Sequence, residues 1–259
     1  MKENETVKIA ALAGEIMLSA GAETMRVEET MYRMMEAKGL TEIETFCTTT
    51  GIFACATGSD DEVVTVIKRV KVRSNNLEKI AKVNDLSRCF VEGRLDETAA
   101  IRQLDHIHNL LPYPVLIRIV AAAIASLCFA YLFGGIWMDA LNTLITAILM
   151  QIPVILLERK TVIPTLVTIT GGAFGTLIAL TLFNLGIGEN VEFIITGAIM
   201  PLVPGVALTN AIRDILDGNM LAGSARTLEA LLTAVAIAAG VGIVLNWWMS
   251  LFGNLLISK

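Results

Sequence analysis

Five long apolar runs fill the chain from residue 115 to residue 251, and each is close to the length at which a helix crosses a bilayer. The runs are residues 115–134, 136–157, 162–185, 191–212 and 228–251. A helix needs about 20 apolar residues to span the hydrocarbon core. Because a backbone in lipid must satisfy its own hydrogen bonds, the runs predict a polytopic α-helical membrane protein with five transmembrane helices.

The first 112 residues differ in composition from the rest. Over the whole chain, 54% of residues are hydrophobic and 17% are charged, which is too apolar for a soluble domain of this length. Charged residues concentrate before Pro112, and Pro112 and Pro114 suit a stop before a new helix. We therefore predict a small cytoplasmic α+β domain over residues 1–112, here called the head, and a five-helix transmembrane domain over residues 113–259.

Residue spacing within the head predicts the element order ααβββαα. Two groups of apolar residues lie at helical spacing. Gly21 lies between them and is predicted to end the first helix, and Thr24 is a possible N-cap of the second. The second group contains a methionine stripe that is typical of plain core and less often of a functional surface: Val27, Met31, Met34 and Met35. The pattern is β-rich in three segments, residues 42–48, 52–57 and 62–72. Apolar residues at helical spacing return from residue 80 and again after residue 96.

Positive residues in the connections predict the orientation of the chain. Arg159, Lys160, Arg213 and Arg226 lie in alternate connections, and the other two connections have none. By the positive-inside rule, the head and these connections are cytoplasmic and the C-terminus is external. The first apolar patch is too short for a cleavable signal peptide, and the inner membrane of a prokaryotic cell is the expected location.

Two prolines interrupt the fourth run. Proline removes a backbone donor and clashes with the preceding turn, so Pro201 and Pro204 with Gly205 predict a break near the middle of the membrane. Such breaks are tolerated where the backbone is buried or lines a polar cavity, and transporters often bind substrate there. If the helix resumes after the break, one face carries a polar stripe of Asn210, Asp214 and Asp217. Arg213 can then pair with Asp217, and the stripe is either a cytoplasmic loop helix or part of a substrate pathway.

Polar residues in the other runs are further candidates, because charged and amide groups are costly in lipid. Arg118 is either an interfacial anchor or a substrate contact. Capping or solvation at the interface can explain Asp139 at the external start of the second run, whereas Asn142 on the same face lies deeper. Glu158 and Arg159 are interpreted as a solvated pair. Small-residue pairs predict close helix packing: Gly171 with Gly175, Ala121 with Ala125, and Ala236 with Gly240.

Enzyme and metal motifs are not found in the sequence. There is no Walker loop, GxSxG or HExxH, so we predict no catalytic residue, no metal and no cofactor. His106 and His108 lie two apart and do not share a helix face that could grip an ion. The four cysteines have no CxxC spacing and are interpreted as small core residues. Nucleic acid is not an expected partner.

Several motifs resemble those of a known family. They are the segment GAETMRVEE with Thr24, Arg26 and Glu28, the break MPLVPG, and NAIRD followed by Gly218, Gly223 and Arg226. In these motifs, and in the order of head, five runs and break, the chain resembles the threonine/serine exporter (ThrE) family. It is most similar to the short YjjP-like members that correspond to the N-terminal half.

This resemblance implies secondary export of a small polar metabolite, driven by the proton motive force. The substrate would be threonine and serine, or a dicarboxylate such as succinate. Full-length exporters resemble two consecutive five-span halves, so the resemblance also implies a separate small membrane subunit or, failing that, a homo-oligomer. Membrane lipid is the other expected partner.

The residues and the resemblance together give a hypothesis for the site. The proposed substrate pathway contains Pro201, Pro204, Gly205, Asn142, Asn210, Arg118 and Arg213. Asp214 is the proposed coupling acid, because a carboxylate near a dry pathway can exchange a proton near neutral pH. The alternatives are a membrane-anchored cytoplasmic sensor or enzyme domain, and a structural subunit of another transporter. Five runs rich in Gly, Pro and Thr exceed what an anchor needs.

Overall fold

The computed structural model describes residues 2–71, 74–160 and 163–253, and the chain divides into two compact units. The first unit comprises Met1–Leu111 and Gly205–Glu229, and the second comprises Pro112–Pro204 and Ala230–Lys259. One boundary, after Leu111, therefore lies one residue before the predicted end of the head. Residues 205–229, which we assigned to the transmembrane domain, instead pack with the head, so the units do not follow chain order.

The first unit contains the predicted order of helices and strands. Its elements are α1 (Lys2–Ser19), α2 (Thr24–Glu36), β1 (Thr41–Cys47), β2 (Gly51–Thr57), β3 (Val63–Arg69), α3 (Leu77–Val91), α4 (Glu97–His108), α9 (Gly205–Leu216) and the start of α10 (Met220–Phe252). The three strands form an antiparallel sheet in the order β1-β2-β3. The predicted end of the third strand at residue 72 lies outside the described residues.

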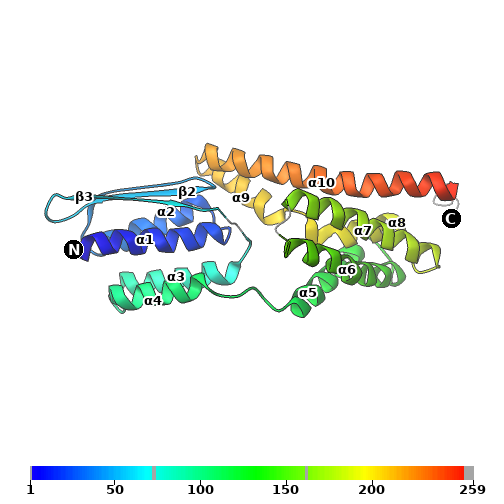
Figure 1. Cartoon of the computed structure of the whole chain (residues 1–259), viewed down its shortest axis with the longest axis horizontal. Helices are drawn as coiled ribbons and strands as arrows, with labels where there is room; N and C mark the ends of the chain where they lie inside the picture. Colours follow the sequence, from blue (N-terminus) through cyan, green and yellow to red (C-terminus); the bar gives the residue numbers. More distant parts are fainter. Residues whose placement is uncertain (1, 72–73, 161–162, 254–259) are drawn as a thin grey trace. The chain divides into compact units, whose positions relative to one another are not determined.

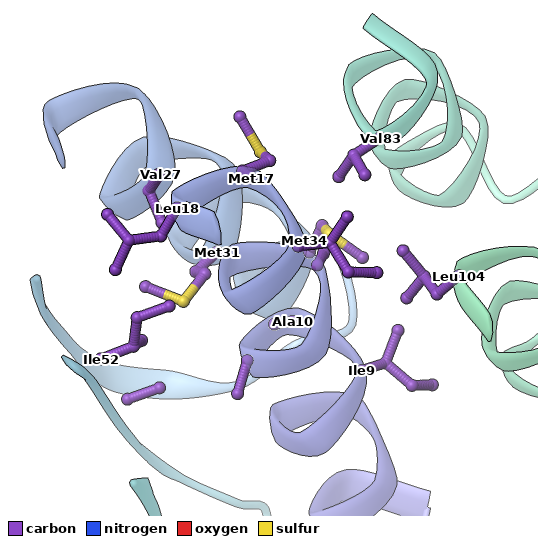
Figure 2. Packing of buried hydrophobic residues seen from close by; sticks show 14 of the residues in the cluster. Ile9, Ala10, Met17, Leu18, Val27, Met31, Met34, Ile52, Val83 and Leu104 are labelled. Atoms are coloured by element: carbon purple, nitrogen blue, oxygen red, sulfur yellow. The ribbon is translucent and has the colours of Figure 1, made fainter. Parts of the chain in front are cut away.

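The head is built in three layers, in which α1 and α2 lie between the sheet and the pair α3–α4 (Figure 1). Figure 2 shows the core between these layers, where Met31 and Met34 of α2 share one cluster with Ile52 of β2, Val83 of α3 and Leu104 of α4. All five side chains are fully buried. Burying a side chain of this size contributes roughly 1.5–3 kcal/mol. The methionine stripe is therefore core, as the spacing predicts.

The second unit is a helix bundle. It contains α5 (Val115–Leu132), α6 (Trp137–Glu158), α7 (Pro164–Asn184), α8 (Val191–Ile199), a 3₁₀ turn η1 (Met200–Leu202) and the rest of α10. Within the described ranges, four helices are long and apolar enough to cross a membrane, namely α5, α6, α7 and α10. A fifth is present if Val191–Leu202 and Gly205–Leu216 form one broken span. These helices agree with the predicted runs, although the predicted start of the third at residue 162 lies outside the described residues.

Helix α10 begins earlier than the hydropathy pattern predicts. The apolar run starts at residue 228, whereas α10 starts at Met220 and has 33 residues. Residues 213–227, predicted as a connection, form the end of α9, a turn and the first turns of α10. The prediction is wrong because Arg226, whose charge is typical of a connection, is neutralised inside the fold by Asp214.

Helices α7 and α10 approach closely at two glycines. A Cβ atom added at Gly240 would lie 2.3 Å from the carbonyl oxygen of Ile169, and one added at Gly172 would lie 3.0 Å from that of Ile237. The two helices therefore meet backbone to backbone, which is the role that the small-residue pattern predicts for Gly240.

Candidate functional site

The helical structure is interrupted between α8 and α9, where the two prolines predict a break. Helix α8 ends at Ile199, η1 makes a single 3₁₀ turn, and Val203 is extended with φ −66° and ψ 130°. Helical structure resumes at Gly205 as α9. Pro201 and Pro204 have no N–H to donate, so the α-helical hydrogen bonds cannot run through this segment. The predicted break in the helix is confirmed, and its position near the middle of the membrane stays a prediction.

Helix α9 and the start of α10 form a tight hairpin in the first unit. Gly218 has φ +89°, a left-handed conformation that favours glycine, and it follows the end of α9. The N–H of Asn219 donates to the carbonyl oxygen of Asp214 at 2.7 Å. A Cβ atom added at Gly223 would lie 2.9 Å from a backbone oxygen of α9, so the helices touch there. The hairpin thereby places Arg226 beside Asp214.

The carboxylate of Asp214 is fully buried and is held from two sides. Its Oδ1 accepts hydrogen bonds from the N–H of Thr24 at 3.1 Å and from the hydroxyl of Thr24 at 2.8 Å. Its Oδ2 forms an ion pair with Nε of Arg226 at 3.1 Å. Arg226 also donates from Nη2 to the carbonyl oxygen of Ala22 at 2.7 Å. Each charge depends on the other, because a buried charge without a partner is strongly destabilising.

Further contacts bind residues 21–24 to the hairpin. Asn210 donates from Nδ2 to the carbonyl oxygen of Gly21 at 2.8 Å. Asn219 donates from Nδ2 to the hydroxyl of Thr24 at 3.0 Å. Arg213 forms an ion pair with Glu23. The short loop before α2 is therefore the common partner of the polar residues of α9.

Two predicted local contacts are wrong. Thr24 is not the N-cap of α2, because it is the first residue of that helix and its hydroxyl donates to Asp214. Arg213 does not pair with Asp217, because Asp217 is exposed beyond the end of α9 and Glu23 lies within reach. In both cases a partner distant in the sequence replaces the local one.

Glu28 lies one turn further along α2, near the buried pair. Its Oε1 accepts a hydrogen bond from the N–H of Cys47 at 2.7 Å. Burial raises the pKa of Glu28 above its ordinary value, hydrogen bonds from Cys47 and Asn219 lower it, and the charge of Asp214 raises it again. The net shift is upward, so the pKa of Glu28 lies above that of an ordinary glutamate and the carboxyl keeps its proton to a higher pH.

A second polar cluster lies at the start of α6 in the second unit. The carboxylate of Asp139 accepts backbone hydrogen bonds at 2.6 Å from Glu189, 2.9 Å from Asn190 and 3.1 Å from Ile136. Asn142 donates from Nδ2 to the carbonyl oxygens of Ile187 at 2.7 Å and Ala179 at 3.3 Å. Both side chains are fully buried. They share one face of α6, as predicted. Their hydrogen bonds hold the connection between α7 and α8 against α6.

Arg118 of α5 lies beside the C-terminal end of α6. Its Nη2 forms a 2.8 Å ion pair with Oε2 of Glu158, and the two side chains are 39% and 43% exposed. Glu158 therefore pairs with Arg118, and the predicted pair of Glu158 with its neighbour Arg159 is wrong. Asn142 and Glu158 are sixteen residues apart, which is about 24 Å along a helix. Arg118 and Asn142 thus belong to separate clusters of the second unit.

Sequence reasoning missed two residues of the Asp214 site, Glu23 and Asn219, and it missed the pairing of Asp214 with Arg226. One signal could have indicated this pairing. Gly218 between two helical segments is typical of a helix end followed by an antiparallel return, and such a return brings residues on either side of the turn together.

The histidine, cysteine and acidic side chains are the remaining candidate metal ligands. Among the residues that the structure describes, no group of three or more His, Cys, Asp or Glu side chains could hold a metal ion. Cys47 is buried, Cys55 and Cys89 are half-buried, and Cys128 is exposed. The interpretation of the cysteines as core residues fits Cys47. Cys128, which we expect to face helices or lipid, lies on the face of α5 away from its buried residues.

Comparison with known proteins gives two groups of relatives. The family model described as "Putative threonine/serine exporter" matches residues 8–248. A "Probable threonine/serine exporter" of Mycobacterium tuberculosis is 26% identical over 243 residues, which cover 93% of this chain and 45% of that protein. A "Threonine/serine exporter" of Corynebacterium glutamicum is 27% identical over 244 residues, covering 92% and 50%. The chain spans about half the length of these two relatives.

The second group of relatives aligns over nearly its whole length. A protein of Escherichia coli (strain K12) named "Probable succinate transporter subunit YjjP" is 24% identical over 248 residues, which cover 95% of this chain and 96% of that protein. A protein of Klebsiella aerogenes with the same name is 25% identical over 233 residues, covering 90% of each. No solved structure matches the chain significantly.

Proposed function

Because this chain belongs to the threonine/serine exporter family, we propose that it is a subunit of a secondary exporter in the bacterial inner membrane. The substrate is a small polar carboxylate, either threonine and serine or a dicarboxylate such as succinate. The proton motive force drives export. Since the family is one of transporters, an enzyme activity is not part of this proposal.

The observation that carries the proposal is the near full-length similarity to relatives named as succinate transporter subunits, together with the candidate membrane spans. We propose that a separate small membrane subunit, or a second copy of this chain, completes the transporter. The word "subunit" in the names of these relatives supports this part of the proposal.

We assign proton coupling to Asp214. In the ion pair, its negative charge compensates Arg226. A proton on Asp214 would cancel that charge and leave Arg226 without an anion, so a substrate carboxylate could take the same place. Threonine, serine and succinate all carry a carboxylate. Proton uptake and substrate binding would then be linked at a single arginine. For inward proton flow to drive export, the proton would reach Asp214 from the outer side and leave to the cytoplasm, while the substrate would reach Arg226 from the cytoplasm and leave to the outer side.

The other pathway residues keep the roles that the sequence suggests for them. The break at Pro201, Pro204 and Gly205 frees backbone groups from the helical ladder, and such groups can bind substrate. Polar contacts to the substrate are proposed for four side chains, those of Asn142, Asn210, Arg118 and Arg213. The head is proposed to lie on the cytoplasmic side, which the distribution of positive residues supports.

Inverted membrane vesicles from cells that produce the chain test this function. Labelled threonine, serine and succinate are supplied with and without a co-produced candidate partner, under an imposed proton gradient. Export then appears as uptake, and a protonophore should abolish it. No uptake of any of the three substrates in either preparation would contradict the proposal.

The variant Asp214→Asn tests the coupling residue separately. It should lose accumulation driven by the proton gradient but keep exchange of labelled for unlabelled substrate, because exchange moves no net proton. Asp217→Asn is the matched control, since Asp217 is exposed and lies less than one turn away; it should keep both activities. If Asp214→Asn accumulates substrate normally, the coupling assignment fails while the function stands.

A further inference from the structure

A pocket of about 610 Å³ lies in the head between α2 and the end of α3. Three arginines line it, Arg26 and Arg33 from α2 and Arg88 from α3, against two glutamates, Glu29 and Glu92. The chain as a whole has a net charge of −5. A pocket with an excess of cations therefore runs against the overall composition, and its charges decide what it can bind.

Both glutamates of the pocket are already neutralised. Glu29 pairs with Arg33 at 2.5 Å, and Glu92 pairs with Arg94 outside the pocket. The guanidinium of Arg88, in contrast, has no ion-pair or hydrogen-bond partner among the described residues. Among the residues that the structure describes, Arg26 has only a 3.7 Å pair with Glu23, which also pairs with Arg213. One guanidinium is thus free and a second is weakly held.

We propose that this pocket binds a small oxyanion with two negative charges, of the dicarboxylate or phosphate class. A guanidinium binds either group through two parallel hydrogen bonds, so Arg88 and Arg26 suit one such anion between them. The side-chain amide of Asn84 also lines the pocket and has no partner within the described parts of the chain. The volume lies in the range usual for small-molecule sites.

Helix α2 connects this pocket to the Asp214 site. Glu23 pairs with both Arg26 of the pocket and Arg213 of α9, and the adjacent Thr24 binds Asp214. An anion that attracts Arg26 would leave Glu23 to Arg213 alone. The pocket is therefore placed for a ligand that regulates the site. This regulatory consequence rests on the proposed function, whereas the binding itself does not.

Calorimetric titration of the full chain in detergent tests the binding, with succinate and inorganic phosphate as probes. Arg88→Ala should weaken binding about tenfold or more, because it removes the free charged donor. Added salt should also weaken it, since the arginines are exposed. The matched control is Arg102→Ala, because Arg102 is equally exposed but lies on α4 outside the pocket. It should leave the affinity unchanged.

Three results would overturn the proposal. They are no binding of either probe at millimolar concentration, equal loss of affinity in both variants, and a succinate signal that survives Arg88→Ala and so belongs to another site. Binding of phosphate and succinate with similar affinity would support an anion site without selectivity, and preference for one would identify its class. Because the readout is binding, failure here leaves the vesicle transport assay as an independent test of the proposed function.

Discussion

Replacement of Asp214 by asparagine should destabilise the first unit by about 3–5 kcal/mol. The new side chain has the same size and one oxygen that can still accept from Thr24, but it removes the charge opposite Arg226. The Arg226 side chain is only 8% exposed. Removing one partner of a buried ion pair typically costs about 3–5 kcal/mol, because the remaining charge has neither water nor partner. At about 2–4 °C per kcal/mol, the unfolding midpoint should fall by roughly 6–20 °C.

Thermal unfolding of the full chain in detergent measures this change. A thiol-reactive dye follows it in a background where Cys55, Cys89 and Cys128 are replaced by alanine. Cys47 in the first unit is the buried cysteine, and burial raises the pKa of its thiol, so it reacts only when the unit opens. Asp217→Asn, at an exposed site, should change stability by no more than about 0.5 kcal/mol.

A double variant separates the ion pair from general damage to the fold. Asp214→Asn combined with Arg226→Met removes both charges, so it should be less destabilised than the sum of the two single variants. The reasoning is refuted if Asp214→Asn loses less than about 1 kcal/mol, which is what an exposed pair contributes. It is equally refuted if the losses of the two single variants simply add.

Gly240→Ala should destabilise the contact between α7 and α10 by about 1–3 kcal/mol, because its methyl group would lie 2.3 Å from a backbone oxygen. Gly242→Ala has nothing within 4 Å, and equal thermal shifts for the two variants would contradict this packing. Glu28→Gln should flatten the pH dependence of stability. Because the pKa of Glu28 in the folded state is raised above 4.5, the protonated carboxyl stabilises the fold. That stabilisation is complete below about pH 4.5 and is lost as the pH rises through the raised pKa. The unfolding midpoint measured across weakly acidic pH checks this, with Glu29→Gln as control, and an unchanged slope would count against it. Asp139→Asn should speed hydrogen exchange in the connection between α7 and α8, because an amide oxygen cannot replace both carboxylate oxygens as acceptors; unaltered exchange would show that the carboxylate does not hold it.

Helices, strands and the break could be predicted from the sequence, because each depends on local composition. Apolar length predicts α5, α6 and α7, and the two prolines predict the interruption at Pro201 and Pro204. The start of α10 could not be predicted in this way. Arg226 is typical of a connection until its buried partner is known, and Asp214 lies in a different helix.

Contacts of the candidate site were harder to predict, because its partners are distant in the sequence. Thr24 and Asp214 are 190 residues apart, and so are Glu23 and Arg213. Local rules offer Arg213 a partner at Asp217, but an exposed helical pair of this kind contributes only about 0.3–0.5 kcal/mol. Such a small free energy does not fix the partner of Arg213, and the fold brings Glu23 within reach of it instead. The stripe of α9 could therefore be predicted as polar, but not as the partner of the loop before α2.

Connectivity gives the buried pair a significance beyond the stability of the first unit. Helix α9 is joined to α8 through η1 and the non-helical residues 203–204. Helix α10, in contrast, is one continuous helix. Its first turns belong to the first unit and its remainder belongs to the second. A break can absorb a rotation, but an unbroken helix carries a displacement of its first turns along its length. Release of Arg226 from Asp214 would therefore act on the second unit through α10 more than through α9. If Asp214 is the coupling acid that we propose, this asymmetry is the physical reason to expect that its protonation reaches the proposed transport pathway through α10.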